Sequence, residues 1–205
     1  MLAISTATKK AYIGIDYNGK RYFSCIDADC KQSENILKEI DKLLDKNGIA
    51  FKDVGNIAVV IGPGSFTGIR IGTALVKGLC AGDPSHKVYP ISTLDLMSKV
   101  FQKKNKGQEH YCVMNALSGR IFYAKYDADG NKVGREEMSF TGDDIDIRKS
   151  VFLIEEYNDI DGGIQLDSET LLDYALELER TKEGIDAREL TPVYIRKSQA
   201  EENIQ

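Results

Sequence analysis

The stretch Gly62–Gly72, GPGSFTGIRIG, holds four glycines and a proline in eleven residues. It directly follows NIAVVI at 56–61, a short apolar run of the kind found in strands that are buried on both faces of a parallel sheet. Residues 66–82 continue with helical periodicity. We therefore predict a tight strand-to-helix turn, in which glycines permit positive φ angles and allow another backbone to come close. Strand, turn and helix in this order predict an α/β fold with a parallel sheet.

Glycine-rich turns also bind phosphate in nucleotide-binding proteins, but neither common fingerprint is present. A Walker loop ends in Lys followed by Ser or Thr, whereas this loop ends in Gly68-Ile69-Arg70. The Rossmann pattern places its third glycine three residues after the second, and Gly68 comes four residues after Gly64. A weak anion site at the start of the helix is the lesser interpretation. The loop residues that would form it are Gly62, Gly64, Ser65, Phe66, Thr67 and Gly68.

The helix predicted over 66–82 is apolar around most of its circumference. Arg70 and Lys77 are its only charged residues, although a surface helix normally has one polar face. Gly68, Gly72 and Gly78 would each cost about 1 kcal/mol relative to alanine inside a helix, so the close approach of another backbone must offset them. We predict that the helix is packed on two sides, by its own sheet and either by a partner protein or by a second domain of the chain.

The remaining residues indicate two related halves. Residues 2–26 read as consecutive β-hairpins, 33–48 as an amphipathic helix, and 87–102 as a strand followed by a helix. Residues 111–133 then repeat the pattern of the opening hairpins. A duplicated domain is the economical explanation of this repeat. The alternative is a chance likeness between two β-meanders.

A shift of 110 residues places Ser5 over Asn115, at the end of the first strand of each half. The polar stretch QKKNKGQEH at 102–110 marks the predicted boundary. We predict an N-terminal domain over 1–104, which carries the helices that face a partner, and a smaller C-terminal domain over 105–205.

Composition and charge argue against several functional classes. The 205-residue chain has 32 acidic and 27 basic side chains and a net charge of −5, which argues against a stand-alone nucleic-acid-binding protein. Its one basic cluster coincides with the polar boundary, so a solvated connection is favoured over an RNA-binding patch. That cluster consists of Lys99, Lys103, Lys104 and Lys106. Because the sequence shows neither a leader-like N-terminus nor an apolar run near the ~18 residues of a membrane span, we expect a cytoplasmic protein that binds no membrane.

Cysteine and histidine spacing gives no support to a metal site. The four cysteines form no Cys-x-x-Cys pair and are expected to be buried free thiols. His86 and His110 lie 24 residues apart and not on one helix face, which argues against a metallopeptidase. We expect no metal ligands in this chain.

The loop GPGSFTGIRIG resembles the signature of the TsaB family, also called YeaZ, whose members help to make the threonylcarbamoyladenosine modification of transfer RNA. The resemblance covers most of the chain in the same order. Its further segments are LAISTAT at 2–8, QSENILKEI at 32–40, ISTLDLMS at 91–98, NALSGRIFYAKYD at 115–127 and PVYIRKSQAE at 192–201.

The resemblance implies the fold shared by actin, Hsp70 and sugar kinases, in which two related α/β domains have ribonuclease-H-like topology. In active members of that fold an Asp in the first hairpin of each domain positions magnesium beside ATP. Ser5 and Asn115 stand at those positions here, and the family itself is regarded as catalytically silent. We therefore expect no catalytic residues and no cofactor for this chain alone, with ATP and magnesium in a wider complex.

The resemblance also implies partners. TsaB acts with its paralogue TsaD, which transfers the threonylcarbamoyl group to adenosine 37 of tRNA, and the ATPase TsaE joins the complex. The expected contact or closely supporting positions are Ile36, Leu37, Ile40, Leu44, Ile69, Gly72, Thr73 and Val76. The same patch is suited to forming a homodimer when TsaD is absent, and tRNA would be contacted indirectly. The rival interpretations are a stand-alone ATPase or kinase of the actin-like class and a peptidase-like enzyme.

Overall fold

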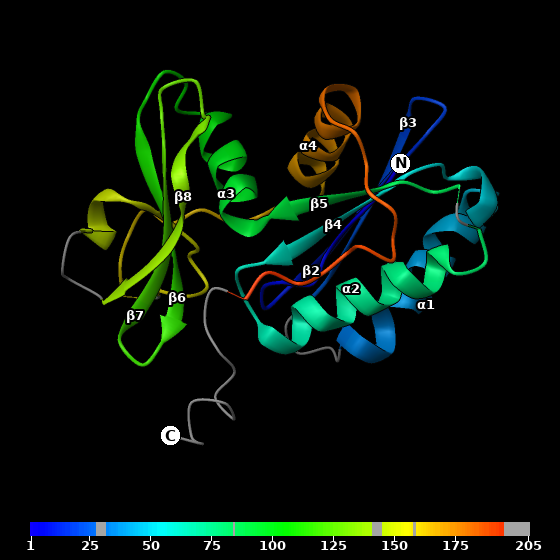
Figure 1. Cartoon of the computed structure of the whole chain (residues 1–205), viewed down its shortest axis with the longest axis horizontal. Helices are drawn as coiled ribbons and strands as arrows, with labels where there is room; N and C mark the ends of the chain where they lie inside the picture. The colour runs from blue at the N-terminus through cyan, green and yellow to red at the C-terminus, as the bar shows by residue number, and fades with distance from the viewer. Residues whose placement is uncertain (28–31, 84, 141–144, 158, 195–205) are drawn as a thin grey trace. The chain divides into compact units, whose positions relative to one another are not determined.

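The computed structural model describes residues 1–27, 32–83, 85–140, 145–157 and 159–194 (Figure 1). Their contacts divide the chain into two compact units. Unit 1 comprises Met1–Ser92 and Asp167–Pro192. Unit 2 comprises Thr93–Leu166 and, among the described residues, also Val193 and Tyr194.

Unit 1 is built on a mixed sheet of five strands in the order β3-β2-β1-β4-β5. Strands β1 to β3 are antiparallel, and β4 and β5 continue parallel to β1. Asn18 and Gly19, with φ of 52° and 76°, form the tight turn between β2 and β3, as the Asn-Gly pair predicts. The strands are β1 (Leu2–Ser5), β2 (Ala11–Tyr17), β3 (Lys20–Ile26), β4 (Ile57–Gly62) and β5 (Val88–Ser92).

Helices cover both faces of this sheet (Figure 1). On one face α1 (Gln32–Lys46) and α2 (Phe66–Cys80) lie side by side over a core that includes Ile4, Ile13 and Val59. On the other face α4 (Ser168–Thr181) lies so close to β2 that a side chain at Gly14 would meet Leu172. Sequence periodicity therefore predicted α1 and α2 correctly, to within a few residues at each end.

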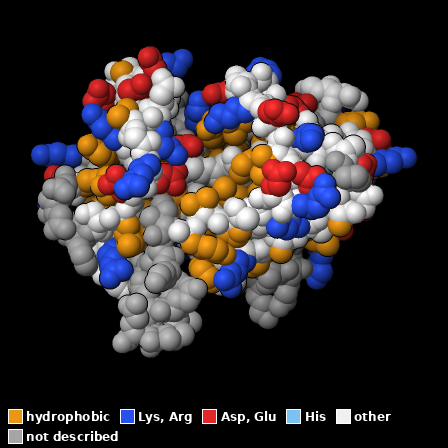
Figure 2. Space-filling model, in the orientation of Figure 1, with side chains coloured by type: hydrophobic (Ala, Val, Ile, Leu, Met, Phe, Trp, Pro, Cys, Tyr) orange, Lys and Arg blue, Asp and Glu red, His pale blue; other side chains and the backbone are white. Residues whose placement is uncertain are grey.

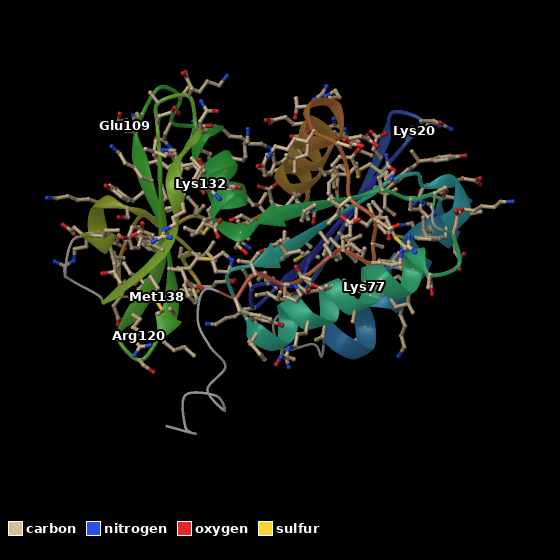
Figure 3. All side chains as sticks on the ribbon, viewed as in Figure 1. Lys20, Lys77, Glu109, Arg120, Lys132 and Met138 are labelled. Carbon is tan, nitrogen blue, oxygen red and sulfur yellow. The ribbon has the colours of Figure 1, made fainter. Side chains whose placement is uncertain are left out.

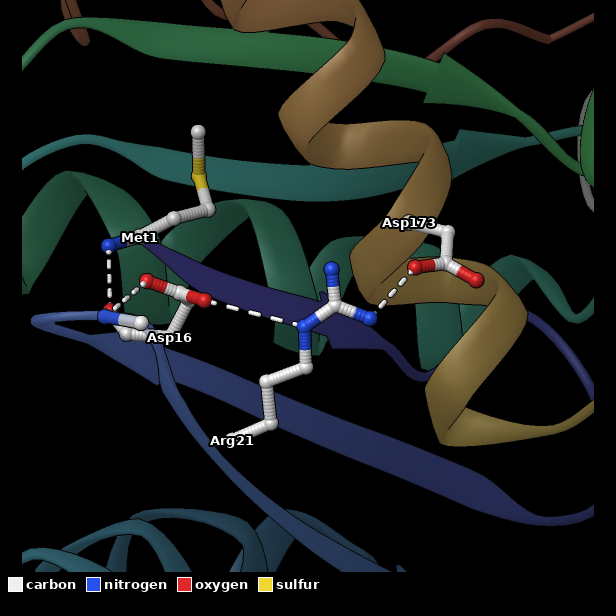
Figure 4. A network of polar contacts seen from close by, with 5 residues as sticks. Met1, Asp16, Arg21 and Asp173 are labelled. Atoms are coloured by element: carbon white, nitrogen blue, oxygen red, sulfur yellow. Dashed lines mark hydrogen bonds and ion pairs between the residues drawn. The ribbon is translucent and has the colours of Figure 1, made fainter.

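Polar contacts add to the apolar packing of α4 against the hairpin of β2 and β3 (Figure 4). The Arg21 guanidinium donates to the Asp173 carboxylate at 2.7 Å and lies 3.7 Å from the Asp16 carboxylate. The Met1 ammonium group donates to the Asp16 carbonyl oxygen at 2.9 Å. The arginine thus joins a strand at the edge of the sheet to the helix above it.

Unit 2 repeats the first part of this topology in a four-stranded sheet of order β8-β7-β6-β9. Strands β6 to β8 are antiparallel, and β9 is parallel to β6, just as β4 is parallel to β1. This agrees with the duplication that the sequence predicts. The elements are α3 (Thr93–Gln102), β6 (His110–Leu117), β7 (Arg120–Tyr126), β8 (Lys132–Phe140), η2 (Ile147–Lys149) and β9 (Val151–Phe152).

The structural units differ from the predicted domains, because α3 packs with unit 2 and α4 packs with unit 1. Partly buried polar contacts fix α3 to the sheet of unit 2: the Tyr126 hydroxyl donates to Asp95 at 2.7 Å, and Lys132 lies 2.9 Å from the same carboxylate oxygen. Burial raises the pKa of Tyr126, which keeps its hydroxyl a donor. A helix is part of the unit in which its apolar face is buried, and α3 buries this face in unit 2. The structural boundary therefore lies between Ser92 and Thr93, before α3, and not in the polar stretch at 102–110.

Candidate functional site

The glycine loop after β4 is clamped against the turn between β1 and β2. The Ser65 N–H donates to the Ala7 carbonyl at 2.7 Å, and the Thr6 hydroxyl donates to the Gly68 carbonyl at 2.7 Å. A side chain at Gly64 would overlap the Ala7 carbonyl, and one at Gly68 would overlap the Thr6 carbonyl. Glycine is therefore required at these two positions by contacts within the chain itself. The close approach that the sequence predicted is made here by the chain's own first turn.

The start of α2 is capped by a side chain of the loop. Ser65 precedes the helix, and its hydroxyl oxygen accepts from the Gly68 N–H at 3.2 Å. The Arg70 guanidinium covers the Phe66 ring at 3.9 Å from its centroid, and Thr67 is exposed. The N–H groups of Ser65 and Gly68 thus have acceptors in the protein. Anion binding by the remaining loop N–H groups stays a prediction.

Ser5 and Asn115 occupy equivalent strand ends in very different surroundings. Ser5 ends β1 with 0% of its surface exposed, and its hydroxyl has no hydrogen-bond partner among the described residues. Asn115, near the end of β6, is exposed. Its side-chain oxygen accepts from the Leu117 N–H at 2.8 Å, and its own N–H donates to the Glu156 carboxylate at 2.8 Å. Sequence reasoning missed Glu156, because a residue 41 positions further along the chain leaves no local signal.

Most of the predicted partner positions are buried inside unit 1. Leu37 is the exception, with 44% of its surface exposed. A side chain at Gly72 would lie 2.5 Å from the Thr6 hydroxyl oxygen, so this glycine also serves the contact with the first turn. The buried positions are Ile36, Ile40, Leu44, Ile69, Gly72, Thr73 and Val76. They lie beneath the outer surface of the two helices, where they can act as the closely supporting positions of the prediction. Their part in a contact with a partner stays a prediction.

The outer surface of α2 carries small residues. Ala74 and Gly78 are exposed and one helical turn apart, and a side chain at Gly78 would have nothing within 4 Å. Half-buried Ile71 and Leu75 border them. Unlike Gly68 and Gly72, Gly78 therefore has no neighbour in this chain, among the described residues, that requires a glycine.

Unit 2 holds a hydrogen-bonded Ser–His pair that resembles part of a hydrolase site. The Ser98 hydroxyl and His110 Nε2 are 2.9 Å apart, and His110 Nδ1 lies 2.9 Å from the Gln108 carbonyl oxygen. Ser98 is 1% exposed and His110 7% exposed, with the ring of Tyr126 stacked on the imidazole at 5.3 Å. A nucleophile so buried cannot meet a substrate, so this pair has the character of a core hydrogen bond that fixes α3.

Metal-binding side chains are not gathered anywhere in the part of the chain that the structure describes: no three His, Cys, Asp or Glu residues lie close enough to hold an ion. His86 belongs to unit 1, where its imidazole contacts the Gly55 carbonyl oxygen, and His110 belongs to unit 2. Within the same described ranges, no helix is both long and apolar enough to cross a membrane.

A family model described as TsaD, tRNA N6-adenosine threonylcarbamoyltransferase, matches residues 27–146. Among curated proteins, the TsaB protein of Escherichia coli K12, a tRNA threonylcarbamoyladenosine biosynthesis protein, is 29% identical over 139 residues. The chain belongs to this family, in its TsaB (YeaZ) branch. The TsaB protein of Haemophilus influenzae is 27% identical over 125 residues. These two matches cover 67% and 61% of the chain but 59% and 52% of the relatives' own length.

Solved structures place the fold among YeaZ proteins. YeaZ from Pseudomonas aeruginosa superposes with a TM-score of 0.77 at 21% identity and covers 94% of this chain and 98% of that one. A second structure, of a protein described by its similarity to the peptidase YeaZ of P. aeruginosa, has a TM-score of 0.78 at 22% identity, with 95% and 98% coverage. The TsaB resemblance that the sequence motifs predict is thus confirmed.

Proposed function

We propose that this TsaB-family chain is a non-catalytic partner of a TsaD-type transferase and supports the formation of N6-threonylcarbamoyladenosine at position 37 of tRNA, in a complex that also contains TsaE. The biosynthetic role is taken from the names of the curated TsaB relatives. The match to the TsaD family model makes the chain a relative of the transferase, as expected of two paralogues that pair. ATP and magnesium would bind elsewhere in the complex.

The surroundings of Ser5 and Asn115 support a non-catalytic role. The repeated sheet topology fits the actin-like fold, in which a carboxylate at each of these strand ends would position magnesium. Ser5 offers a fully buried neutral hydroxyl, and the turn at Asn115 already holds the carboxylate of Glu156 on its backbone N–H. Neither Ser5 nor Asn115 supplies that carboxylate from its own side chain.

The observation that carries the partner assignment is the unexplained glycine in α2. A glycine inside a helix costs about 1 kcal/mol relative to alanine. A side chain at Gly78 would meet no atom within 4 Å, whereas Thr6 leaves no room for a side chain at Gly68 or Gly72. The close approach of a partner backbone at Ala74 and Gly78 accounts for it, and the exposed Leu37 on neighbouring α1 supplies an apolar anchor.

The test is a reconstituted tRNA modification assay with TsaD, TsaE, threonylcarbamoyl-adenylate and substrate tRNA. The variants are Gly78→Arg and Leu37→Glu, which change exposed positions and leave the core of unit 1 intact. We expect each to weaken binding to TsaD by about 2–4 kcal/mol and to reduce turnover in proportion, because each places a charged side chain within the contact. Their thermal unfolding should not fall below that of the wild type, since Gly78→Arg gains helix propensity and Leu37→Glu changes an exposed side chain.

Ala128→Arg, at an exposed turn of unit 2, adds the same positive charge as Gly78→Arg and serves as its control. This variant should bind TsaD normally. If Gly78→Arg binds and works like the wild type, the partner surface lies elsewhere. If modification proceeds equally well without the chain, the proposed function is wrong. Sedimentation of the wild type and of Leu37→Glu without TsaD tests self-association through the same patch.

A further inference from the structure

Two Asn-Gly pairs occur in the chain, and they lie in different surroundings. Asn18-Gly19 forms the turn between β2 and β3, and Asn47-Gly48 directly follows α1. Asn-Gly pairs are prone to lose ammonia, because glycine leaves its backbone nitrogen open to attack the asparagine side chain. The nitrogen must turn toward the side-chain carbonyl carbon for this attack. A hydrogen bond that holds either group therefore slows the reaction.

Both reacting groups are held at the pair that follows α1. The Asn47 side-chain amide donates to the Leu43 carbonyl oxygen at 2.7 Å, and the Gly48 N–H donates to the Asp45 carbonyl oxygen at 3.1 Å. Asn47 is also half-buried. Both bonds must break before the Gly48 nitrogen can reach the side chain, so the folded end of the helix protects this pair.

The reacting groups are held much less at the turn between β2 and β3. Asn18 and Gly19 are both exposed, and no hydrogen bond joins the Asn18 side chain to another described residue. The Gly19 N–H donates to the Asp16 carboxylate at 3.3 Å, which is a long hydrogen bond. Figure 3 shows Lys20, the next residue, at the tip of this hairpin. The turn is therefore open to water and its asparagine side chain can move.

The acceptor of the Gly19 N–H is a group that can take its proton. The attacking nitrogen must give up this proton, and a carboxylate within hydrogen-bond reach is suited to accept it. The second oxygen of Asp16 lies 3.7 Å from the Arg21 guanidinium, which keeps the carboxylate beside the turn (Figure 4). At Gly48 the acceptor is a backbone carbonyl oxygen, which is far less basic. The two pairs thus differ in chemistry as well as in freedom.

We propose that Asn18 is a site of spontaneous deamidation, with Asp16 as the proton acceptor, and that Asn47 is protected. The Gly19 nitrogen forms a bond to the side-chain carbonyl carbon of Asn18, and the bond from that carbon to the amide nitrogen breaks. The proton of the Gly19 nitrogen passes through Asp16 to the leaving group, which departs as ammonia. Water then opens the cyclic imide at either carbonyl and leaves aspartate or isoaspartate. This proposal is independent of the proposed function.

The two products should affect the hairpin differently. Both add one negative charge, but isoaspartate also adds a carbon atom to the backbone of a two-residue turn that fixes the register of β2 and β3. Charged side chains of both signs are interspersed on the visible surface, so one more carboxylate changes that surface little (Figure 2). Isoaspartate should in addition disturb the bond between Arg21 and Asp173, which joins β3 to α4.

The first test incubates the intact protein at mildly alkaline pH and follows deamidation by mass spectrometry. Trypsin places the two pairs in separate peptides, 11–20 and 47–52. We expect Asn18 to deamidate about tenfold faster than Asn47, because two hydrogen bonds hold the second pair and one long bond holds the first. In protein unfolded by guanidinium chloride the two rates should converge. A difference that persists there would show that the local sequence sets the rates, and would overturn the proposal.

The second test concerns the proton acceptor. In Asp16→Asn the side-chain oxygen can still accept from the Gly19 N–H, but an amide is not a base, so deamidation of Asn18 should slow about tenfold. The rate at Asn47 should not change, which reports in the same digest that the fold is intact. Asp45→Asn is the matched control and should change neither rate, because the acceptor beside Gly48 is the backbone carbonyl.

The third test compares the products. Asn18→Asp supplies the charge without the extra carbon and should unfold in urea like the wild type. The deamidated fraction of aged protein, isolated by ion exchange, contains isoaspartate and should unfold at a lower urea concentration. Equal rates at the two pairs in the folded protein, or a rate at Asn18 that Asp16→Asn leaves unchanged, would overturn the proposal.

Discussion

The turn between β1 and β2 and the turn between β6 and β7 occupy equivalent places in two sheets of the same topology, yet they are held in different ways. In unit 1 the backbone of Thr6 and Ala7 is pressed against Gly64 and Gly68. In unit 2 the hairpin closes through three successive residues with positive φ, Leu117, Ser118 and Gly119, and the Glu156 carboxylate accepts from the N–H of Asn115 at its base.

The difference shows that a duplicated scaffold can keep its topology while the two copies of a site change separately. The first copy is closed by packing, and its Ser5 is enclosed completely. The second copy stays at the surface, and Glu156 satisfies its first N–H. The first turn should therefore tolerate little change, and the second should tolerate much more.

The largest contrast is expected from a carboxylate at the two strand ends. Ser5→Asp would bury a charge without a partner and should lower the free energy of unfolding by about 3–5 kcal/mol. Asn115→Asp, at an exposed position, should change it by less than about 1 kcal/mol. Urea unfolding followed by circular dichroism measures both. Equal effects of the two substitutions would contradict the asymmetry.

A smaller contrast is expected from alanine at the glycines of the two turns. Gly68→Ala would drive a methyl group into the Thr6 carbonyl and should cost about 3 kcal/mol. Gly119→Ala meets no atom within 4 Å, so only its φ of 70° opposes the substitution, at about 1–2 kcal/mol. Thermal unfolding of both variants gives the comparison. Gly78→Ala is the matched control and should stabilise the protein slightly, because it gains helix propensity.

The smallest effect concerns the thiols, which report how often each unit opens. Burial raises the pKa of Cys80 in unit 1 and raises that of fully buried Cys112 in unit 2 well above its usual value. At pH 8 both should be almost wholly protonated and should react with a disulfide reagent far more slowly than exposed Cys25. Stopped-flow labelling in a Cys25→Ser/Cys30→Ser background isolates the two buried thiols. Labelling of Cys112 faster than Cys80 would indicate that unit 2 is the looser unit.

Much of the fold could be predicted from the sequence, because its signals are local. Helical spacing predicted α1 and α2, and an Asn-Gly pair predicted the turn between β2 and β3. The exchange of α3 and α4 between the halves could not be predicted, because it depends on which sheet buries each helix. The spacing of apolar residues along the chain does not indicate which of the two sheets a helix packs against.

The candidate site was predictable only in part. The glycine motif predicted the close approach of another backbone. Residue types alone do not reveal whether that backbone belongs to a partner or to the chain's own Thr6. Likewise, the apolar stripe of α1 that includes Ile36 and Ile40 has the same pattern whether it faces a partner or its own sheet. Solvent exposure separates these alternatives, and it left Leu37 as the outward position.

The packing of α4 on the sheet of unit 1 has a consequence for synthesis on the ribosome. Residues 1–92 leave the ribosome first, but one face of their sheet stays bare until α4, which ends at Thr181, has been made. Residues 93–166 form the body of unit 2 without interruption. Although domains usually fold in order from the N-terminus, the second-made unit of this chain can complete its core before the first. The apolar face of the unit 1 sheet then stays exposed to solvent until α4 has been synthesised. A chaperone that binds exposed apolar surface would be expected to bind there.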